Sequence, residues 1–329
     1  MTSDTSSGPA EQAKQKLDRV DAFQQQHTPV AIPIAVVKKF AEDKSTNLAS
    51  MIAFWAFFSI FPLLLVFVTL LGFFLPTGTK DSVLHQVAHF FPLLDTSSID
   101  GLTGSWWALI LGIITAFWSG SAVVRTAQFA FNSVWETPYH QQPKLVEKLL
   151  RSLLVLSTIG VGLVISVLIT GFISGASHTL HLAWFGHVIG YVLAVALDVA
   201  LFVAAFRMLT DRDVSTKDVL PGAVLSGVAF WILQSLSSLI ISHYLSNAQS
   251  TYGKFATVIT MLWWFYITAI VTLMGAQLNV VLKERLYPRG LVAPQTEADH
   301  RFYDNVAKER TYHEDQQVET RFADAERKR

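Results

Sequence analysis

The stretch FFSIFPLLLVF, residues 57–67, places Pro62 in the middle of an apolar run that extends from Leu48 to Leu75. Inside a water-soluble helix, a proline removes a backbone hydrogen bond and clashes with the preceding turn, at a cost of about 3 kcal/mol. In a lipid-embedded bundle, hydroxyl groups and neighbouring helices can satisfy the freed carbonyl, and Ser59 is placed to help. As a helix the run would be about 42 Å long, more than the hydrocarbon core needs. Pro62 is therefore either a packing kink or a hinge that lines a cavity.

Composition supports a membrane setting for this run. The chain has 329 residues, of which 51% are hydrophobic and only 15% are charged, whereas a soluble protein carries about 25% charged residues. The charged residues crowd into the two ends and a few short connectors, and the windows between them are apolar over about 20 residues or more. The sequence thus predicts an all-α, polytopic membrane protein with six transmembrane helices, at about 48–75, 105–124, 151–174, 186–207, 218–242 and 256–282.

The distribution of basic residues predicts the orientation of these spans. Among the 25 Lys and Arg residues, only Lys80 and Lys254 fall on the side of the first, third and fifth connectors. Positive residues are enriched in cytoplasmic loops. We therefore expect both termini to be cytoplasmic.

Composition also divides the chain along its length. Residues 1–29 are polar and lack a signal-peptide pattern, which predicts a flexible cytoplasmic leader. Residues 30–285 form the predicted membrane domain, which begins with a helix along the inner surface at about 30–44. Residues 286–329 mix acidic and basic side chains, which predicts a charged, largely solvated cytoplasmic tail.

Several kinds of chemistry are excluded by what the chain lacks. It has no cysteine and a net charge of zero, so it offers no thiolate site, and nothing indicates a nucleic-acid partner. Hydrolysis of RNA with metal ions requires clustered carboxylates or histidines, but Asp198 is the one acid that lies away from the ends of a predicted span. His85 and His89 are four residues apart in an outer connector, where neutral histidine is an ordinary substitute for Lys and Arg. We therefore predict no catalytic residues, no metal and no cofactor.

Asp198, in YVLAVALDVALFVAAF (191–206), is the most informative single residue. A carboxylate at a helix centre costs about 2.5–3.5 kcal/mol on the insertion scale, so it should face the bundle interior or a water-filled cavity. It is either a proton- or cation-linked site or a structural clamp that makes interhelical hydrogen bonds. Its expected partners are Gln234 and the hydroxyls of Ser157 or Ser166.

Other polar residues lie near the predicted inner ends of spans. Arg125 follows the second span and either extends to phosphate headgroups or contributes to a ligand site, with Asn132 seven residues later. Gln277 and Asn279 lie near the inner end of the sixth span and are either interhelical hydrogen-bonders or a polar gate.

Small residues recur at four-residue spacing in and before the second span. The row consists of Gly104, Ala108, Gly112, Ala116 and Gly120. Such a stripe permits close helix–helix contact. Whether its partner belongs to the same chain or to a second copy in a homo-oligomer is left open.

Four stretches resemble the YihY/BrkB family of bacterial inner-membrane proteins. They are LASMIAFWAFFSIFPLLLVF (48–67), LGIITAFWSGSAVVRTAQFAFNSVWE (111–136), DVLPGAVLSGVAFWILQSLSSLIISHY (218–244) and YGKFATVITMLWWFYITAIVTLMGAQLNVVL (252–282). The resemblance implies a six-helix inner-membrane protein without a settled activity; members have been called virulence factors, transporters or ribonuclease BN. It also adds weight to a role for Arg125 and Asn132. In place of the usual Gly-Ala-Glu-Leu-Asn this chain has Gln277, which puts in doubt any role for an ionised carboxylate there.

Two functions remain. The first is a transporter that moves a lipid or an amphiphilic small molecule through a midplane cavity, where Pro62, Asp198, Gln234 and the WWFY stretch (263–266) would converge. The second is a structural or regulatory envelope protein with a dry bundle. In either case, membrane lipids are the expected surroundings.

Overall fold

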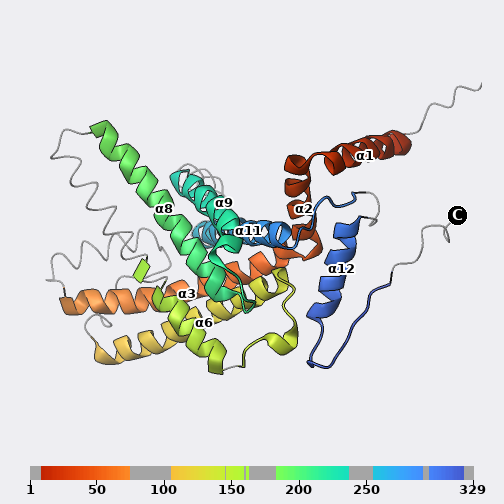
Figure 1. The fold of residues 1–329 in the computed structure, drawn as a ribbon. Helices are drawn as coiled ribbons and strands as arrows, with labels where there is room; N and C mark the ends of the chain where they lie inside the picture. The colour runs from red at the N-terminus through yellow and green to blue at the C-terminus, as the bar shows by residue number, and fades with distance from the viewer. Residues whose placement is uncertain are drawn as a thin grey trace, which may run out of the picture.

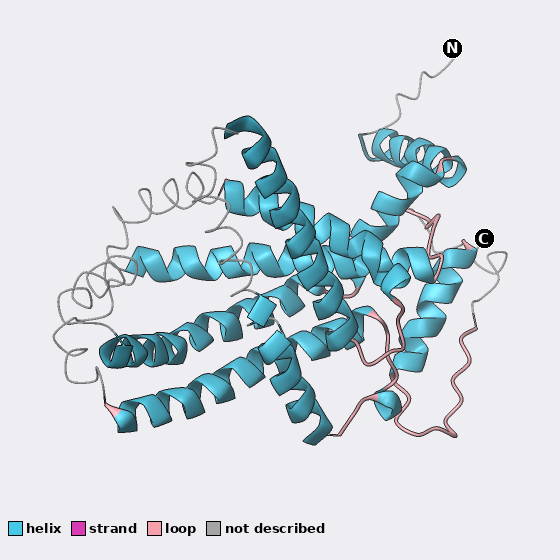
Figure 2. Ribbon diagram, turned by 60° about the vertical axis from the view of Figure 1, so that its left-hand side comes forward, coloured by secondary structure: helices cyan, strands magenta, loops and turns pink. Residues whose placement is uncertain are grey.

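The computed structural model describes residues 9–74, 105–144, 146–158, 161–162, 183–236, 255–291 and 296–321, and this part of the chain is helical without strands (Figures 1 and 2). The helices are α1 (Pro9–Gln26), α2 (Thr28–Glu42), α3 (Ser45–Phe74), α6 (Trp106–Val134), the short η1 (Tyr139–Gln141), α8 (Ala183–Leu209), α9 (Thr216–Ser235), α11 (Phe255–Lys283) and α12 (Glu297–Glu309). Residues 146–158 are also helical.

Five described helices are long and apolar enough to cross a membrane: Ser45–Val66, Trp106–Val134, Tyr191–Leu209, Thr216–Ser235 and Phe255–Lys283. They correspond to the first, second, fourth, fifth and sixth predicted spans, so the all-helical membrane fold is confirmed. Most of the third predicted span, 151–174, lies outside the described residues, as do His85, His89, Gly104 and Ser166.

Helix α6 extends beyond the predicted end of the second span at residue 124 and ends at Val134. Arg125 suggested an exit from the membrane at that point, and Gln128 and Asn132 follow it on the same helix. In the structure Gln128 and Asn132 are buried and Arg125 is half-buried, so their polarity marks an inward-facing surface of the helix rather than its end.

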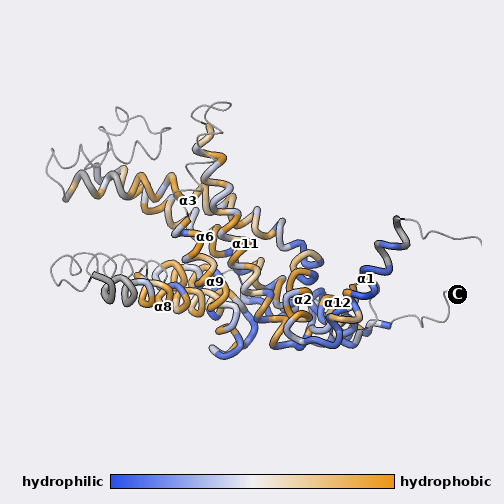
Figure 3. Tube along the Cα trace, turned by 90° about the horizontal axis from the view of Figure 1, so that it is seen from above, coloured by the Kyte–Doolittle hydropathy of each residue, from blue (hydrophilic) through white to orange (hydrophobic). Residues whose placement is uncertain are grey.

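The bundle is formed by α3 packed along α6, α11 against both α3 and α9, and α8 against α9 (Figure 1). Small buried side chains such as Ala49, Ala130 and Ala276 allow the helices to approach closely. Large apolar side chains, including Ile114 and Trp118 of α6, remain exposed. Figure 3 shows hydrophobic residues along the long helices and hydrophilic ones on α1 and α12. This distribution suits helices that face lipid.

Helix α3 continues through Pro62, which is half-buried. The carbonyl that the proline frees is that of Phe58, four residues earlier. The hydroxyl of Ser59 donates instead to the carbonyl of Ala56, at 2.7 Å. The expectation that Ser59 satisfies the freed carbonyl is therefore wrong.

Helices α1, α2 and α12 gather at one end of the bundle (Figure 1). Within the predicted leader, Gln24 of α1 is buried and its Nε2 donates to the carbonyl of Arg289 at 2.6 Å. Within the predicted tail, Thr296 caps α12 and Phe302 is buried against the core. The leader thus packs against the tail through Gln24, and the tail packs against the membrane domain through Phe302, because each segment presents a residue that buries well on an otherwise polar helix.

Candidate functional site

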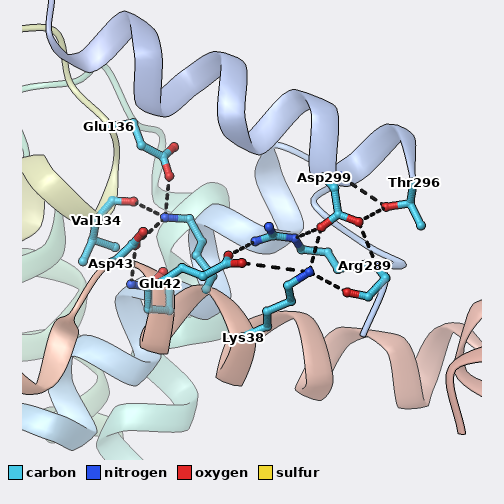
Figure 4. Close-up of polar contacts among 11 residues, drawn as sticks. Lys38, Glu42, Asp43, Val134, Glu136, Arg289, Thr296 and Asp299 are labelled. Carbon is cyan, nitrogen blue, oxygen red and sulfur yellow. Dashed lines mark hydrogen bonds and ion pairs between the residues drawn. The ribbon is translucent and has the colours of Figure 1, made fainter. Parts of the chain in front are cut away.

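A fully buried lysine lies at the centre of the bundle end that carries α1, α2 and α12. Nζ of Lys39, on α2, lies 2.6 Å from Asp43 Oδ2 and 2.6 Å from Glu136 Oε1, and donates to the carbonyl of Val134 at 2.9 Å (Figure 4). A buried ammonium is tolerated only when it is paired and hydrogen-bonded. The contacts of Lys39 therefore join α2 to the residues that follow α6.

Glu136 is poised to change its charge near neutral pH. It lies just past the end of α6 with a φ of 45°, in the left-handed region. Burial raises the pKa of Glu136 to about 7, although Lys39 opposes the shift; Asp43 and Glu309 add to it. Burial alone would lower the pKa of Lys39, but the carboxylates of Glu136 and Asp43 outweigh it and raise that pKa.

Two polar side chains of α11 make interhelical hydrogen bonds near this cluster. Nε2 of Gln277 donates to Asp43 Oδ2 at 2.7 Å and to the hydroxyl of Ser45 at 3.0 Å. Oδ1 of Asn279 accepts from the backbone N–H of Gly222, on α9, at 2.6 Å. An amide can donate to Asp43, whereas an ionised carboxylate at position 277 would repel it, which gives the glutamine a physical role here.

A second cluster holds α12 against α2. Asp299 receives hydrogen bonds or ion pairs from Lys38 at 3.0 Å, Arg289 at 2.8 Å, the Gly290 N–H at 2.8 Å and the Thr296 hydroxyl at 2.6 Å (Figure 4). Burial would raise the pKa of Asp299, but these four donors outweigh it and lower the pKa to about 2. The carboxylate is thus ionised over the whole physiological range.

The guanidinium of Arg289 completes this second cluster. It is fully buried, pairs through Nη1 with Glu42 at 2.8 Å, and lies 4.1 Å from the ring centroid of Phe302. A stacked and doubly paired arginine of this kind holds its neighbours in one geometry. The cluster therefore fixes Arg289, Gly290 and α12 on α2.

A third cluster joins α6 to the connector between α8 and α9. Nδ2 of Asn132 donates to Asp211 Oδ2 at 2.5 Å, and its Oδ1 accepts from the Asp211 N–H at 3.0 Å. Arg151 pairs with the same carboxylate and donates to the carbonyl of Thr210 at 2.6 Å. Asn132 is thus a bidentate bridge between elements, an arrangement that could not be predicted from the sequence.

The intramembrane residues that the sequence singled out are not paired in this way. Asp198 is half-buried on α8, and Gln234 is exposed near the end of α9. Across the described ranges, neither makes a side-chain hydrogen bond or an ion pair, and the expected partner Ser157 is exposed. Convergence of Pro62, Asp198 and Gln234 on a cavity remains a prediction.

Helix α6 contains a polar face that sequence reasoning did not assemble. Ser121 and Gln128 are buried, and within the described part of the chain neither the Ser121 hydroxyl nor either amide atom of Gln128 has a hydrogen-bond partner. Arg125 lies between them, half-buried, and makes no hydrogen bond or ion pair within the described residues. The spacing of these residues, four and then three positions apart, is the feature of the sequence from which this shared helix face could have been found.

The small residues of α6 do not share one neighbour. A Cβ added at Gly112 would lie 3.1 Å from the side chain of Val66 on α3, whereas one at Gly120 would meet Leu156 at 3.4 Å. Ala108 is buried and Ala116 half-buried. The tightest approach lies elsewhere, between α9 and α11, where a Cβ on Gly222 would lie 2.0 Å from the carbonyl oxygen of Gly275.

These clusters do not resemble a metal centre. Among the described residues no group of three or more His, Cys, Asp or Glu side chains could hold a metal ion. The acids at this end of the bundle instead face Lys38, Lys39, Arg151 and Arg289. The arrangement can hold elements together and exchange a proton at Glu136.

Comparison with known proteins supplies relatives but no structural template. The ribonuclease-like protein YfkH of Bacillus subtilis is 26% identical over 262 residues, which cover 75% of this chain and 93% of YfkH. A UPF0761 membrane protein of Aromatoleum aromaticum is 24% identical, over 74% of this chain and 61% of that protein. A UPF0761 membrane protein of Pseudomonas aeruginosa is 25% identical, over 73% of this chain and 60% of that protein. No solved structure matches the chain.

The resemblance seen in the sequence motifs extends over most of the membrane domain. The family model described as virulence factor BrkB matches residues 36–300. The matched region includes Lys39, Glu136, Gln277 and Asp299, and so contains both ion clusters on α2. The chain is therefore a member of the BrkB virulence-factor family.

Proposed function

We propose that this protein is a translocator that moves a lipid or an amphiphilic small molecule through its helical bundle in a bacterial inner membrane. In this proposal both termini are cytoplasmic and the protein catalyses no covalent chemistry. Membrane lipids surround it, and no nucleic acid is bound. The observation that carries the proposal is a contrast between the two parts of the bundle.

At the end that carries α1, α2 and α12, charged side chains are matched with opposite charges at distances of 2.6 to 3.0 Å. Within the spans, Asp198 and Arg125 have no such partners among the described residues, and the buried amide of Gln128 has none either. A buried polar group left without a hydrogen bond costs about 1–3 kcal/mol. Ionisable groups inside a membrane usually mark the path of a substrate or an ion.

A ribonuclease activity, suggested by the name of YfkH, is less consistent with the arrangement of charges. Phosphodiester hydrolysis by metal ions needs carboxylates that are free to hold cations and activate water. The buried acids Asp43, Glu136, Asp211 and Asp299 each pair with a lysine or an arginine instead. A transport role makes no such demand on them.

The alternative is a structural or regulatory envelope protein. One observation favours it. The end of the bundle that carries α1, α2 and α12 offers a folded platform, fixed by Arg289 and Asp299, on which another protein could dock. That role does not explain the unpaired polar groups within the spans. We therefore rank it second.

Reconstitution separates the two. Purified protein in liposomes would be assayed for transbilayer movement of fluorescently labelled phospholipids, and mass spectrometry would identify what co-purifies with it. We expect wild type to accelerate lipid movement and Asp198→Leu to abolish it without loss of folding. Asp213→Asn, which alters an exposed acid in the connector after α8, is the matched control. Equal movement in protein-free and protein-containing liposomes would favour the structural role.

A further inference from the structure

The polar face of α6 is compact enough to act as one site. Ser121, Arg125 and Gln128 follow the spacing i, i+4, i+7, which places their side chains on the same face of a helix. Asn132 continues this face one turn later, and its side chain is hydrogen-bonded to Asp211. Ser121, Arg125 and Gln128 have no comparable partner among the residues that the structure describes.

The lack of partners is most informative for the buried members. The exposed fractions of Ser121 and Gln128 are 1% and 2%, and the Ser121 hydroxyl and both amide atoms of Gln128 are unpaired. Buried polar groups in folded proteins are nearly always hydrogen-bonded, so an exception calls for a missing partner. Arg125 is only half-buried, so the face can be reached from outside at its centre.

The chemistry of the three side chains limits what that partner can be. Arginine offers up to five N–H donors and no acceptor, the glutamine amide offers two donors and one acceptor oxygen, and the serine hydroxyl offers one donor and can also accept, so donors predominate. The carboxylate at the end of this face, Asp211, is already held by Arg151 and Asn132. The complement of such a donor-rich set beside an uncompensated positive charge is an oxyanion with several acceptor oxygens.

We propose that Ser121, Arg125 and Gln128 form a binding site for a phosphate group on the inward-facing surface of α6. The site rests on the proposed translocation and deepens it, because it assigns the substrate an anionic, phosphate-bearing headgroup. The phosphate can belong to a phospholipid or to a free phosphate ion. In either case Arg125 supplies the charge, and Gln128 and Ser121 supply directional hydrogen bonds.

Native mass spectrometry of the full chain in detergent tests the site directly. The probes are phosphatidylglycerol, phosphatidylcholine with the same acyl chains, and inorganic phosphate. We expect wild type to retain one phosphatidylglycerol molecule, and Arg125→Gln and Gln128→Leu each to reduce that retention at least tenfold. Arg207→Gln is the control, because Arg207 lies at the end of α8, is exposed and contacts Thr216. If inorganic phosphate displaces the lipid, the ligand is a free phosphate; if it does not, the ligand is a lipid headgroup.

Some outcomes would overturn the site. Retention unchanged in Arg125→Gln, or reduced equally by Arg207→Gln, would show that headgroups only touch the protein periphery. A thermal unfolding midpoint measured for each variant checks its folding. Should Gln128→Leu misfold, Gln128→Glu has nearly the same shape and should still lose the lipid through charge repulsion.

The binding assay and the transport assay test the two proposals independently, so either proposal can be rejected without the other. Specific retention of phosphatidylglycerol without any lipid movement in liposomes would leave the site in place and remove the translocator. Lipid movement that persists in well-folded Arg125→Gln and Gln128→Leu variants would leave the translocator in place and remove the site.

Discussion

Nζ of Lys39 and Oε1 of Glu136 lie 2.6 Å apart in a fully buried ion pair that joins α2 to the residues following α6. Asp43 contacts the same lysine, and Glu309 of α12 adds negative charge nearby. One lysine therefore faces three acids, from the residues just past α2, from those just past α6 and from α12. Burial is the main reason that the pKa of Glu136 rises to about 7, and the negative charges of Asp43 and Glu309 add to the shift while Lys39 opposes it.

The first prediction concerns pH. Because the pKa of Glu136 rises on folding from 4.5 to about 7, the folded state binds the extra proton and stability falls as pH increases through that window. The shift corresponds to roughly 3 kcal/mol. Thermal unfolding midpoints in detergent should fall between pH 4.5 and 7.5 in wild type and should change less in Glu136→Gln. Glu319→Gln, an exposed acid, should behave as wild type; parallel curves for wild type and Glu136→Gln would contradict the assignment.

The second prediction concerns attachment of the tail. Asp299→Asn leaves the buried guanidinium of Arg289 with Glu42 as its one remaining carboxylate, and breaking a buried pair from one side costs about 3 kcal/mol. We expect α12 to detach from α2 while the spans stay folded. Limited proteolysis should then cleave residues 297–321 much faster than in wild type, whereas Asp304→Asn on the same helix should not increase cleavage.

The stability from Asp299 has the opposite pH dependence to that from Glu136. The pKa of Asp299 is lowered from 3.8 to about 2, so its contribution is present above pH 3.8 and is lost as pH falls toward 2. Tail protection in wild type should therefore persist at pH 5. Rapid cleavage at that pH by an acid-active protease would contradict the lowered pKa.

The third prediction concerns the contact between α9 and α11. In Gly222→Ala the new Cβ would lie 2.0 Å from the carbonyl oxygen of Gly275 and 2.6 Å from the side chain of Asn279. The helices must separate, so we expect a large drop in folded yield and unfolding midpoint. Gly120→Ala, whose Cβ meets Leu156 at an ordinary 3.4 Å, should be nearly neutral. Equal behaviour of the two variants would rule out close packing at Gly222.

The fourth prediction concerns Gln277. In Gln277→Glu a carboxylate would replace the amide that donates to Asp43 at 2.7 Å, so two acids would share a buried site and one would have to hold a proton. The variant should be less stable than wild type at pH 8 and recover as pH falls toward 5. Gln234→Glu, at an exposed position, should lack this dependence. Wild-type stability of Gln277→Glu at pH 8 would contradict the repulsion.

The apolar spans could be predicted from the sequence because lipid selects for length and hydropathy, which are properties of single segments. Helix α11 (Phe255–Lys283) begins and ends within a residue of the predicted 256–282. The ion clusters could not be predicted in this way, because Lys39, Glu136 and Asp299 are far apart in sequence and pair through packing. Lys39 contributed only a positive charge to the orientation argument, although it is fully buried.

Polar residues inside helices were harder to interpret. Arg125 was placed where the second span leaves the bilayer, and α6 continues as a helix to Val134. In the sequence, a polar residue that faces lipid headgroups cannot be distinguished from one that faces the interior of a bundle. A helical projection distinguishes the two orientations, because it shows one common face that consists of Ser121, Arg125, Gln128 and Asn132.

The contacts between α2 and the segment after α11 also constrain how often the chain crosses the bilayer. Lys38 reaches Asp299, and Gln24 reaches the Arg289 carbonyl, so the start of the first span and the end of the last span lie on the same side of any membrane that they cross. Two ends on one side require an even number of crossings, whereas the described residues contain five candidate spans. We therefore expect one further crossing among the remaining residues, and a protein truncated after five crossings should lose these contacts.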